Sequence, residues 1–498
     1  MRRISGILLH ISSLPNRWGI GTLGPEARAF VDILQETGQQ VWQILPLGPP
    51  GLGNSPYHSY SAFAGNMLLI SPDQLAEDGL VQPEDLEVLP AFPAGKAAYT
   101  EVLSSRTVLL RKAWIGFKRS PGRWEKAYTD FLYEQNGWLT DYCLFRVLKS
   151  RDESLCWNQW EEPLRCRDAS ALKVASIAYR EEIEFQRFIQ FIFFRQWFLL
   201  KEYARGSGVM MLGDMPLYVA LDSADVWVNP DLFRLDGQGR MLYSGGVPPD
   251  LFSEDGQLWS CPVYDWDRMA RRDFDWWQAR MHFNFRLYDR VRLDHFRGLV
   301  AYWAVPAGAG TAVEGKWVKA RGGELLERLF SRSGELPLVA EDLGLISPEV
   351  EILRKRFGLP GMKVLQFAWD GDPGNPYLPH NYRRNFVVYT GTHDNDTMLG
   401  WLNKISAAER TVLSRYFGKN PNIWHRKLIE AAWASVAFLA IMPMQDLLEL
   451  DGSARMNLPG IPEGNWEWRF EWTMLKPRHK TFLIELGRKY NRISEPLR

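Results

Sequence analysis

Eight short apolar runs, separated by segments of helical periodicity, restrict the fold of this chain more than any other feature. The runs are rich in Val, Ile and Leu and lack strict alternation, which is typical of parallel strands buried on both faces. The segments between them have helical patterns. Eight strands that alternate with helices predict an α/β fold, a (β/α)₈ barrel of the TIM type. The runs occupy residues 6–10, 41–47, 209–219, 288–296, 336–344, 362–367, 385–394 and 436–445.

Two long insertions interrupt this pattern. Residues 48–180 separate the second run from a long helix, and a segment of that length must have structure of its own, so we predict a mainly helical insertion subdomain. An irregular loop insertion is predicted over about 220–286. Both follow strand C-termini and should rise over the C-terminal face of the barrel, where barrel active sites lie. Residues 1–47 and 181–498 are assigned to the catalytic barrel.

Composition and charge exclude several classes of partner. Lys plus Arg and Asp plus Glu both number 59, so nothing favours binding to nucleic acid or to an anionic membrane. No stretch reaches the roughly 18 uninterrupted apolar residues of a membrane span, and the N-terminus lacks a secretory signal pattern. Four scattered cysteines indicate free thiols in a reducing compartment, so we expect a cytoplasmic protein.

Three acidic residues, Asp294, Glu341 and Asp394, end three different predicted strands, and a barrel would bring them to one mouth. Retaining cleavage of a glycoside needs two carboxyl groups about 5 Å apart, one ionised and one protonated. Arg292 lies on the same strand face as Asp294 and would favour its ionised form. Neighbouring negative charge would raise the pKa of Glu341. A strand-end carboxylate can also cap a helix or pair with Arg, but three at one mouth favour catalysis.

Several motifs then resemble those of one enzyme family, the 4-α-glucanotransferases (amylomaltases or disproportionating enzymes) of glycoside hydrolase family 77, within the α-amylase superfamily. The resemblance runs in order through nearly the whole chain. The motifs are SPYHSYSAFAGN (55–66), GDMPLYV (213–219), GVPPDLFSEDGQLW (246–259), RLDHFRG (292–298), VAEDLG (339–344), YTGTHDNDT (389–397) and RMNLPGIPEGNWEWR (455–469).

This resemblance implies that the chain transfers a segment of an α-1,4-glucan to the 4-hydroxyl of glucose or of another α-1,4-glucan. The implied mechanism is a double displacement through a covalent glucosyl-enzyme. Asp294 would be the nucleophile, Glu341 the acid and base, and Asp394 the residue that binds and distorts the sugar. The implied partners are maltooligosaccharides, amylose or glycogen-type α-glucans, with no metal or other cofactor. The residues implied to bind substrate are Arg292, His393, Asp214, Ser55, Tyr57, Asp250, Trp259, Asp370 and Asn465.

Two other functions stay open at this point. Two-carboxylate chemistry does not decide whether water or a sugar hydroxyl attacks the glucosyl-enzyme, so an α-amylase-like retaining glucan hydrolase is the alternative. A glucan-binding barrel without catalysis would keep an aromatic cleft but lack one of the carboxylates, and all three are present. The HDND motif at 393–396 could hold a cation, yet it has too few oxygen ligands nearby, so we predict no metal.

Overall fold

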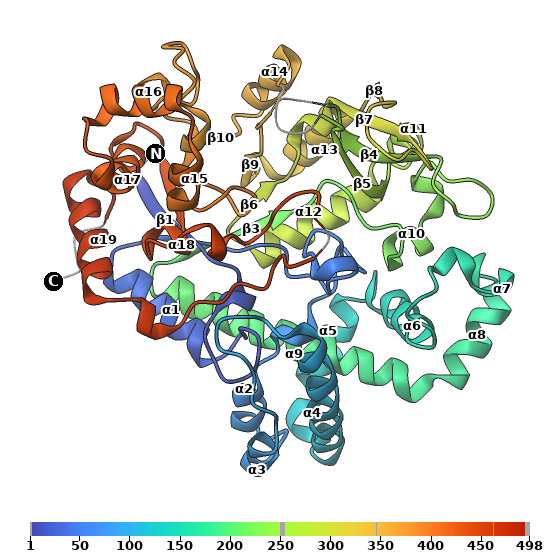
Figure 1. The fold of residues 1–498 in the computed structure, drawn as a ribbon. Coiled ribbons are helices and arrows are strands. Elements are labelled where there is room, and N and C mark those ends of the chain that lie inside the picture. Colours follow the sequence, from blue (N-terminus) through green and yellow to red (C-terminus); the bar gives the residue numbers. More distant parts are fainter. Residues whose placement is uncertain (1, 250–253, 345, 462, 494–498) are drawn as a thin grey trace.

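The computed structural model describes residues 2–249, 254–344, 346–461 and 463–493, and Figure 1 shows their arrangement. Eight strands form one parallel sheet in the order β10–β11–β12–β1–β2–β3–β6–β9. Each of the eight predicted runs overlaps one of these strands, so the prediction of a (β/α)₈ barrel is confirmed. The strands are β1 (Ile4–Leu8), β2 (Val41–Gln43), β3 (Met210–Met215), β6 (Arg290–Leu293), β9 (Leu338–Ala340), β10 (Gly361–Val364), β11 (Phe386–Tyr389) and β12 (Leu439–Pro443).

A side chain helps to close the barrel between β9 and β10, the two ends of this order. The backbone contributes one bond, in which Ala340 N–H donates to Pro360 O at 2.8 Å. The next bond is made by a carboxylate, because Met362 N–H donates to Asp342 Oδ1 at 2.7 Å. Arg354 pairs with Asp342 at 3.0 Å, and both side chains are buried. The wall is therefore completed at this point by a buried ion pair.

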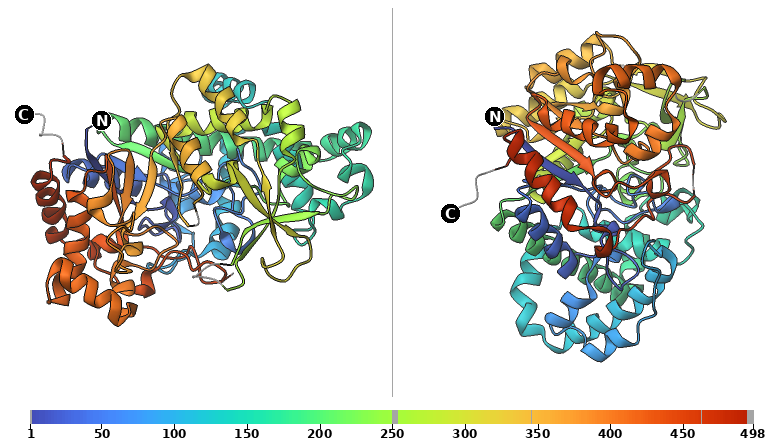
Figure 2. Two further views of the ribbon diagram at one scale, coloured as in Figure 1. Left: turned by 90° about the horizontal axis from the view of Figure 1, so that it is seen from above. Right: turned by 60° about the vertical axis from the view of Figure 1, so that its left-hand side comes forward.

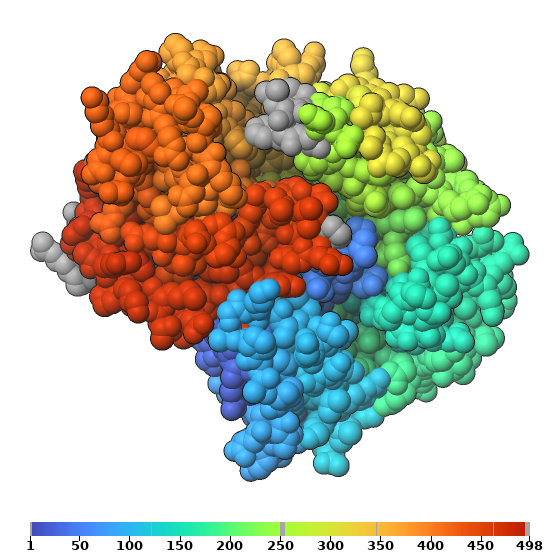
Figure 3. All heavy atoms as spheres, viewed as in Figure 1, coloured from blue at the N-terminus to red at the C-terminus, as the bar shows by residue number. Residues whose placement is uncertain are grey.

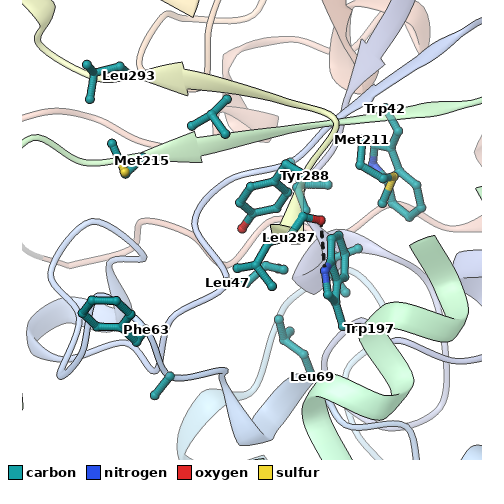
Figure 4. Close-up of a cluster of buried hydrophobic side chains, with 14 of the residues drawn as sticks. Trp42, Leu47, Phe63, Leu69, Trp197, Met211, Met215, Leu287, Tyr288 and Leu293 are labelled. Atoms are coloured by element: carbon teal, nitrogen blue, oxygen red, sulfur yellow. Dashed lines mark hydrogen bonds between the residues drawn. The ribbon is translucent and has the colours of Figure 1, made fainter. Parts of the chain in front are cut away.

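Large apolar side chains pack behind β2 and β3 (Figure 4). Trp42 on β2 and Trp197 on α9 (Arg180–Gly206) are fully buried. The indole N–H of Trp42 donates to Leu9 O at 2.8 Å. That of Trp197 donates to Leu287 O at 3.2 Å. Since each buried indole keeps a hydrogen bond, both can lie in the core without an unpaired donor, and α9 is docked against the strands that lead to the barrel mouth.

Residues 48–180 are mainly helical and gather beside the barrel, at the bottom and right of Figure 1. Aromatic contacts join them to α9; the ring centroids of Phe117 and Phe188 are 5.1 Å apart. The division into barrel and insertion subdomain stays a prediction. The helices are α2 (Pro72–Glu77), α3 (Pro83–Glu87), α4 (Tyr99–Arg119), α5 (Pro121–Glu134), α6 (Leu139–Lys149), α7 (Glu162–Arg165) and α8 (Ala169–Ala178).

The segment predicted as an irregular loop over about 220–286 has regular structure instead. Its two strands join two later ones in an antiparallel sheet of order β5–β4–β7–β8. Gly246, which suggests a turn, instead permits close strand approach, because a Cβ there would lie 2.3 Å from Gln257 O. The elements are α10 (Ala224–Val228), β4 (Tyr243–Val247), β5 (Gln257–Pro262), α11 (Trp266–Arg271), α12 (Asp275–Leu287), β7 (Ala301–Pro306) and β8 (Lys316–Lys319).

The two ends of the described chain lie on the same side of the molecule (Figure 2). The Arg492 guanidinium is fully buried and donates to the carbonyls of Ile4, Trp433 and Ala437 at 2.6–2.9 Å.

In the described residues, no helix is both long and apolar enough to cross a membrane. The remaining helices are α1 (Pro25–Glu36), α13 (Gly322–Ser333), α14 (Pro348–Arg356), α15 (Met398–Lys404), α16 (Ala407–Phe417), α17 (Trp424–Ala434), α18 (Met444–Leu447) and α19 (Pro477–Lys489).

We expect Asp342→Ala to lower the free energy of unfolding by about 3–5 kcal/mol, because it leaves the buried Arg354 without its carboxylate. Denaturant unfolding followed by tryptophan fluorescence measures the loss. The matched control is Asp130→Ala, which removes an exposed pair with Lys126 on α5 and should leave the unfolding midpoint unchanged. Equal midpoints for the two variants would show that the buried pair does not hold the barrel closed.

Candidate active site

Six of the predicted site residues meet at the C-terminal mouth of the barrel. Because the eight strands are parallel, their C-terminal ends face the same way. Figure 3 shows a hollow in one face of the molecule, between the orange-red C-terminal part of the chain and the yellow-green part. The six residues are Asp214 on β3, Arg292 on β6, Asp294 directly after β6, Glu341 directly after β9, and His393 and Asp394 between β11 and α15.

The Arg292 guanidinium joins two of the carboxylates. Its Nη1 donates to both carboxylate oxygens of Asp214 at 2.8 Å, and its Nη2 pairs with Asp294 Oδ1 at 2.8 Å. Burial acts to lower the pKa of Arg292, but the charges of Asp214 and Asp294 outweigh it and raise that pKa well above its ordinary value. Arg292 is thus a permanent cation beside Asp294, whose side chain is 29% exposed.

Glu341 is held from both sides by backbone donors. His295 N–H donates to Oε2 at 2.8 Å, and Leu343 N–H donates to Oε1 at 2.7 Å. Burial raises the pKa of Glu341 to about 7, the charge of Asp294 adds to the rise, and Arg292 with the two N–H groups limits it. Asp294 beside a cation and Glu341 with a pKa near neutrality are two carboxyl groups in different environments, as the two roles in retaining glycoside cleavage require.

His295 connects this pair to the second sheet. Its backbone is in the left-handed region, with φ 47°. In this conformation the backbone N–H of His295 points to Glu341. Its ring lies edge-on to Trp259 of β5, with centroids 4.8 Å apart and planes at 87°. Burial lowers the pKa of His295 to about 4, so the ring is neutral near pH 7. Trp259 therefore lies over the residue that follows Asp294 and covers one side of the mouth.

Asp394 and His393 form a second charged pair. His393 Nε2 lies 3.3 Å from Asp394 Oδ2, and Asn457 Nδ2 donates to Oδ1 at 2.6 Å. Burial acts to raise the pKa of Asp394, but the charge and hydrogen bond of His393, with Asn457, hold it well below its usual range. Burial acts to lower the pKa of His393, yet Asp394 raises it. Asp394 thus presents an ionised, partly exposed carboxylate.

Tyr57, from the loop that follows β2, completes the wall. Its hydroxyl donates to Asp214 Oδ2 at 2.8 Å, and its ring stacks on His393 with centroids 5.0 Å apart and planes at 19°. The Trp466 ring packs at 5.8 Å from Tyr57 and 5.9 Å from His393. Three segments far apart in sequence therefore build one aromatic side of the mouth.

The other predicted residues that the structure describes make hydrogen bonds within their own loops. Ser55 Oγ accepts from Tyr57 N–H at 3.2 Å and shapes the turn that carries Tyr57. Asn465 is buried, and its side-chain amide accepts from Leu458 N–H at 2.8 Å, which closes the 458–465 loop. Asp370 is exposed and accepts from Asp372 N–H at 3.0 Å in its own turn. Asp250 lies outside the described residues.

Sequence reasoning missed two residues that contact Asp394. Asn457 binds the Asp394 side chain, and Arg455 donates to the Asp394 backbone carbonyl. Both belong to the motif at 455–469, so the motif was a signal, but nothing in its spacing assigned them to Asp394. The role of His295 depends on its backbone conformation, for which no residue-type signal exists.

The chain is similar to known proteins over nearly its whole length. A family model described as "4-alpha-glucanotransferase" matches residues 9–475. The 4-alpha-glucanotransferase of Thermus thermophilus is 48% identical over 501 residues, with 99% of each chain covered. That of Synechocystis sp. is 46% identical over 498 residues, with 98% of each covered. The structure of an amylomaltase from Streptococcus agalactiae in complex with acarbose matches with a TM-score of 0.96 at 39% identity, covering 99% of this chain and 100% of that one.

We expect the Glu341 carboxyl to hold its proton below pH 7 and to lose it as the pH rises through about 7. Carbon-13 NMR of protein labelled at the glutamate δ-carbon should show one resonance with that midpoint. The same resonance should be missing from Glu341→Gln. If the resonance lost in this variant instead titrates together with the exposed glutamates, burial does not control this group.

Proposed function

The chain belongs to the 4-alpha-glucanotransferase family, and on that premise we propose that it transfers a segment of an α-1,4-glucan to the 4-hydroxyl of glucose or of another α-1,4-glucan. The observation that supports the proposal is the pair at the barrel mouth: Asp294 beside the Arg292 cation, and Glu341 with its pKa raised to about 7. The proposed substrates are maltooligosaccharides, amylose or glycogen-type glucans. The four free cysteines support a cytoplasmic location.

In the first step, Asp294 attacks the anomeric carbon and Glu341 gives its proton to the leaving oxygen. Arg292 binds Asp294 Oδ1, which leaves Oδ2 for the attack. The carbon–oxygen bond to the leaving chain breaks as the bond to the carboxylate forms, and the product is a covalent glucosyl-enzyme. Arg292 lies against Asp294 before the attack, and burial favours the protonated form of Glu341.

In the second step, Glu341 acts as the base. Once Asp294 is esterified it carries no negative charge, so one of the causes that raise the pKa of Glu341 is removed while Arg292 remains. Ionised Glu341 then takes the proton of the acceptor hydroxyl, and that oxygen displaces Asp294. Two inversions at the same carbon leave the anomeric configuration unchanged.

Asp394 binds the 2- and 3-hydroxyls of the sugar next to the broken bond and favours its distortion. Its low pKa keeps it ionised and able to accept two hydrogen bonds, and Asn457 fixes one of its oxygens. The stacked Tyr57 and His393 rings border the same sugar. Asp214, through Arg292 and Tyr57, holds this wall in place.

Transfer rather than hydrolysis requires that an acceptor sugar reaches the intermediate before water does. Trp259 on one side and Tyr57, packed against the buried Trp466, on the other give the mouth flat apolar faces that suit a pyranose ring. Trp259, Asp250, Asp370, Ser55 and Asn465 are proposed to contact the outer sugars or to shape the loops that do. The helical segment 48–180 is proposed as an insertion subdomain on the barrel formed by 1–47 and 181–498.

We expect maltotriose, supplied as the only substrate, to give a series of longer and shorter maltooligosaccharides together with free glucose. The leaving chain keeps the reducing end of the donor, and the acceptor reacts through its 4-hydroxyl, so the total number of reducing ends should stay constant. Chromatography over time, with a parallel reducing-end assay, measures both quantities. Reducing ends that rise in step with maltotriose consumption would instead identify a retaining glucan hydrolase.

We expect Asp294→Asn to lower kcat by about 10⁴-fold or more, because removal of the nucleophile closes the covalent route. The assay is transfer from maltotriose, with thermal unfolding to show that the variant is folded. Asp32→Asn, on the exposed face of α1, serves as the control and should keep the wild-type rate. A comparable rate and product pattern for Asp294→Asn would exclude Asp294 as the nucleophile.

A further inference from the structure

One buried carboxylate ties both ends of the loop that carries His393 and Asp394. This loop runs from the end of β11 to the start of α15. At its beginning, Thr390 Oγ1 donates to Asp446 Oδ2 at 2.5 Å. At its end, Met398 N–H donates to Asp446 Oδ1 at 2.7 Å. Asp446 is 1% exposed, so these bonds are shielded from water.

Asp446 is itself fixed to the barrel. It lies on α18, which starts directly after β12, and β12 pairs with β11 on one side and β1 on the other. Thr390 N–H also donates to Ile441 O of β12 at 3.2 Å. Inside the loop, Asn395 Oδ1 accepts from Thr392 N–H at 2.9 Å and from Thr392 Oγ1 at 2.8 Å. The loop is thus folded on itself, and Asp446 on α18 holds both of its ends next to β12.

We propose that Asp446 is a positioning residue for the transfer reaction, which sets the place of Asp394 and His393 against the sugar by clamping both ends of their loop. The proposal rests on the proposed function, because it assigns Asp394 to the sugar next to the broken bond. Asp446 contacts neither of these two side chains directly. It acts through the backbone between Thr390 and Met398.

The chemistry of the two donors explains why this position holds a carboxylate. A hydroxyl and an N–H both point at Asp446, and a carboxylate can accept from both at once. Burial raises the pKa of Asp446 to about 6, and the bonds from Thr390 and Met398 oppose that rise. An apolar side chain here would avoid the cost of burying a charge but would leave both donors unpaired. Asn has one oxygen, which can accept from Met398 N–H, while its amino group can donate to the Thr390 hydroxyl.

We expect Asp446→Ala to lower kcat for maltotriose by about 100-fold, the effect of a displacement of about 1 Å at a reacting centre. Asp446→Asn should recover most of this loss, since it can still bond to both partners. Thr390→Val removes one of the two bonds and should give an intermediate loss. The double variant Thr390→Val with Asp446→Ala should lose no more than Asp446→Ala alone, because both changes break the same clamp.

Asp78→Ala is the matched control. Asp78 is also a buried aspartate with two hydrogen bonds, from Arg195 Nη2 at 2.7 Å and Nε at 3.3 Å, but it lies at the end of α2, away from the loop. It should lower the thermal midpoint without changing kcat. A purely structural role for Asp446 predicts that Asp446→Ala behaves in the same way, with kcat intact in the folded protein. That result would overturn the proposal.

Kinetics of Thr390→Val and the affinity for acarbose provide two further tests of the clamp. If Asp446→Ala does not fold, then wild-type kcat in Thr390→Val would overturn the clamp. Acarbose affinity, measured calorimetrically, does not depend on turnover and should fall in Asp446→Ala and recover in Asp446→Asn. Failure of the wild-type protein to transfer from maltotriose would contradict the proposed function. An active wild-type protein together with an unchanged kcat in Asp446→Ala would contradict only the positioning role.

Discussion

The buried guanidinium of Arg292 is the charge on which the barrel mouth depends. Asp214, Asp294 and Glu341 project into one small region, and the guanidinium offsets the repulsion between these carboxylates. The position of Arg292 follows from strand pairing, since Asp214 on β3 and Arg292 on β6 are register partners in the parallel sheet. Asp294 follows two residues later. A shift of one residue between these strands would turn the side chains to opposite faces and separate the charges.

Two carboxyl groups lie in different electrostatic environments here. Asp294 lies beside a fixed cation and remains partly exposed, whereas Glu341 is buried and bonded to backbone N–H groups. Both are attached at strand ends, so their separation is set by the rigid barrel. The residues proposed to border the sugar, namely Tyr57, Trp259 and Trp466, come from loops and the second sheet. The proposed catalytic residues thus belong to the barrel, and the proposed sugar-binding residues belong mainly to the segments added to it.

Prediction from sequence succeeded where the residue types of a segment are typical of only one structural environment. The eight buried strands have a composition that few other environments share, and the acidic residues at their ends, such as Glu341, are visible for the same reason. The sheet formed by β4, β5, β7 and β8 was not predicted, because its pairs join distant segments and its glycines resemble turn signals. The clamp by Asp446 and the left-handed backbone of His295 depend on bonds between elements, which no local pattern encodes.

The circular order of the barrel has a consequence for biosynthesis. Strand β1, made first, is paired in register with β12, and Arg492 near the other end binds the carbonyl of Ile4. A nascent chain on the ribosome therefore carries a mostly apolar strand with one unpaired edge until the last barrel strand, β12, has been translated. Such long-range pairing is slow, and the apolar edge of β1 stays exposed until it is complete. The time between synthesis of β1 and arrival of β12 is when this protein is most exposed to aggregation, and when a chaperone that covers strand edges would matter most.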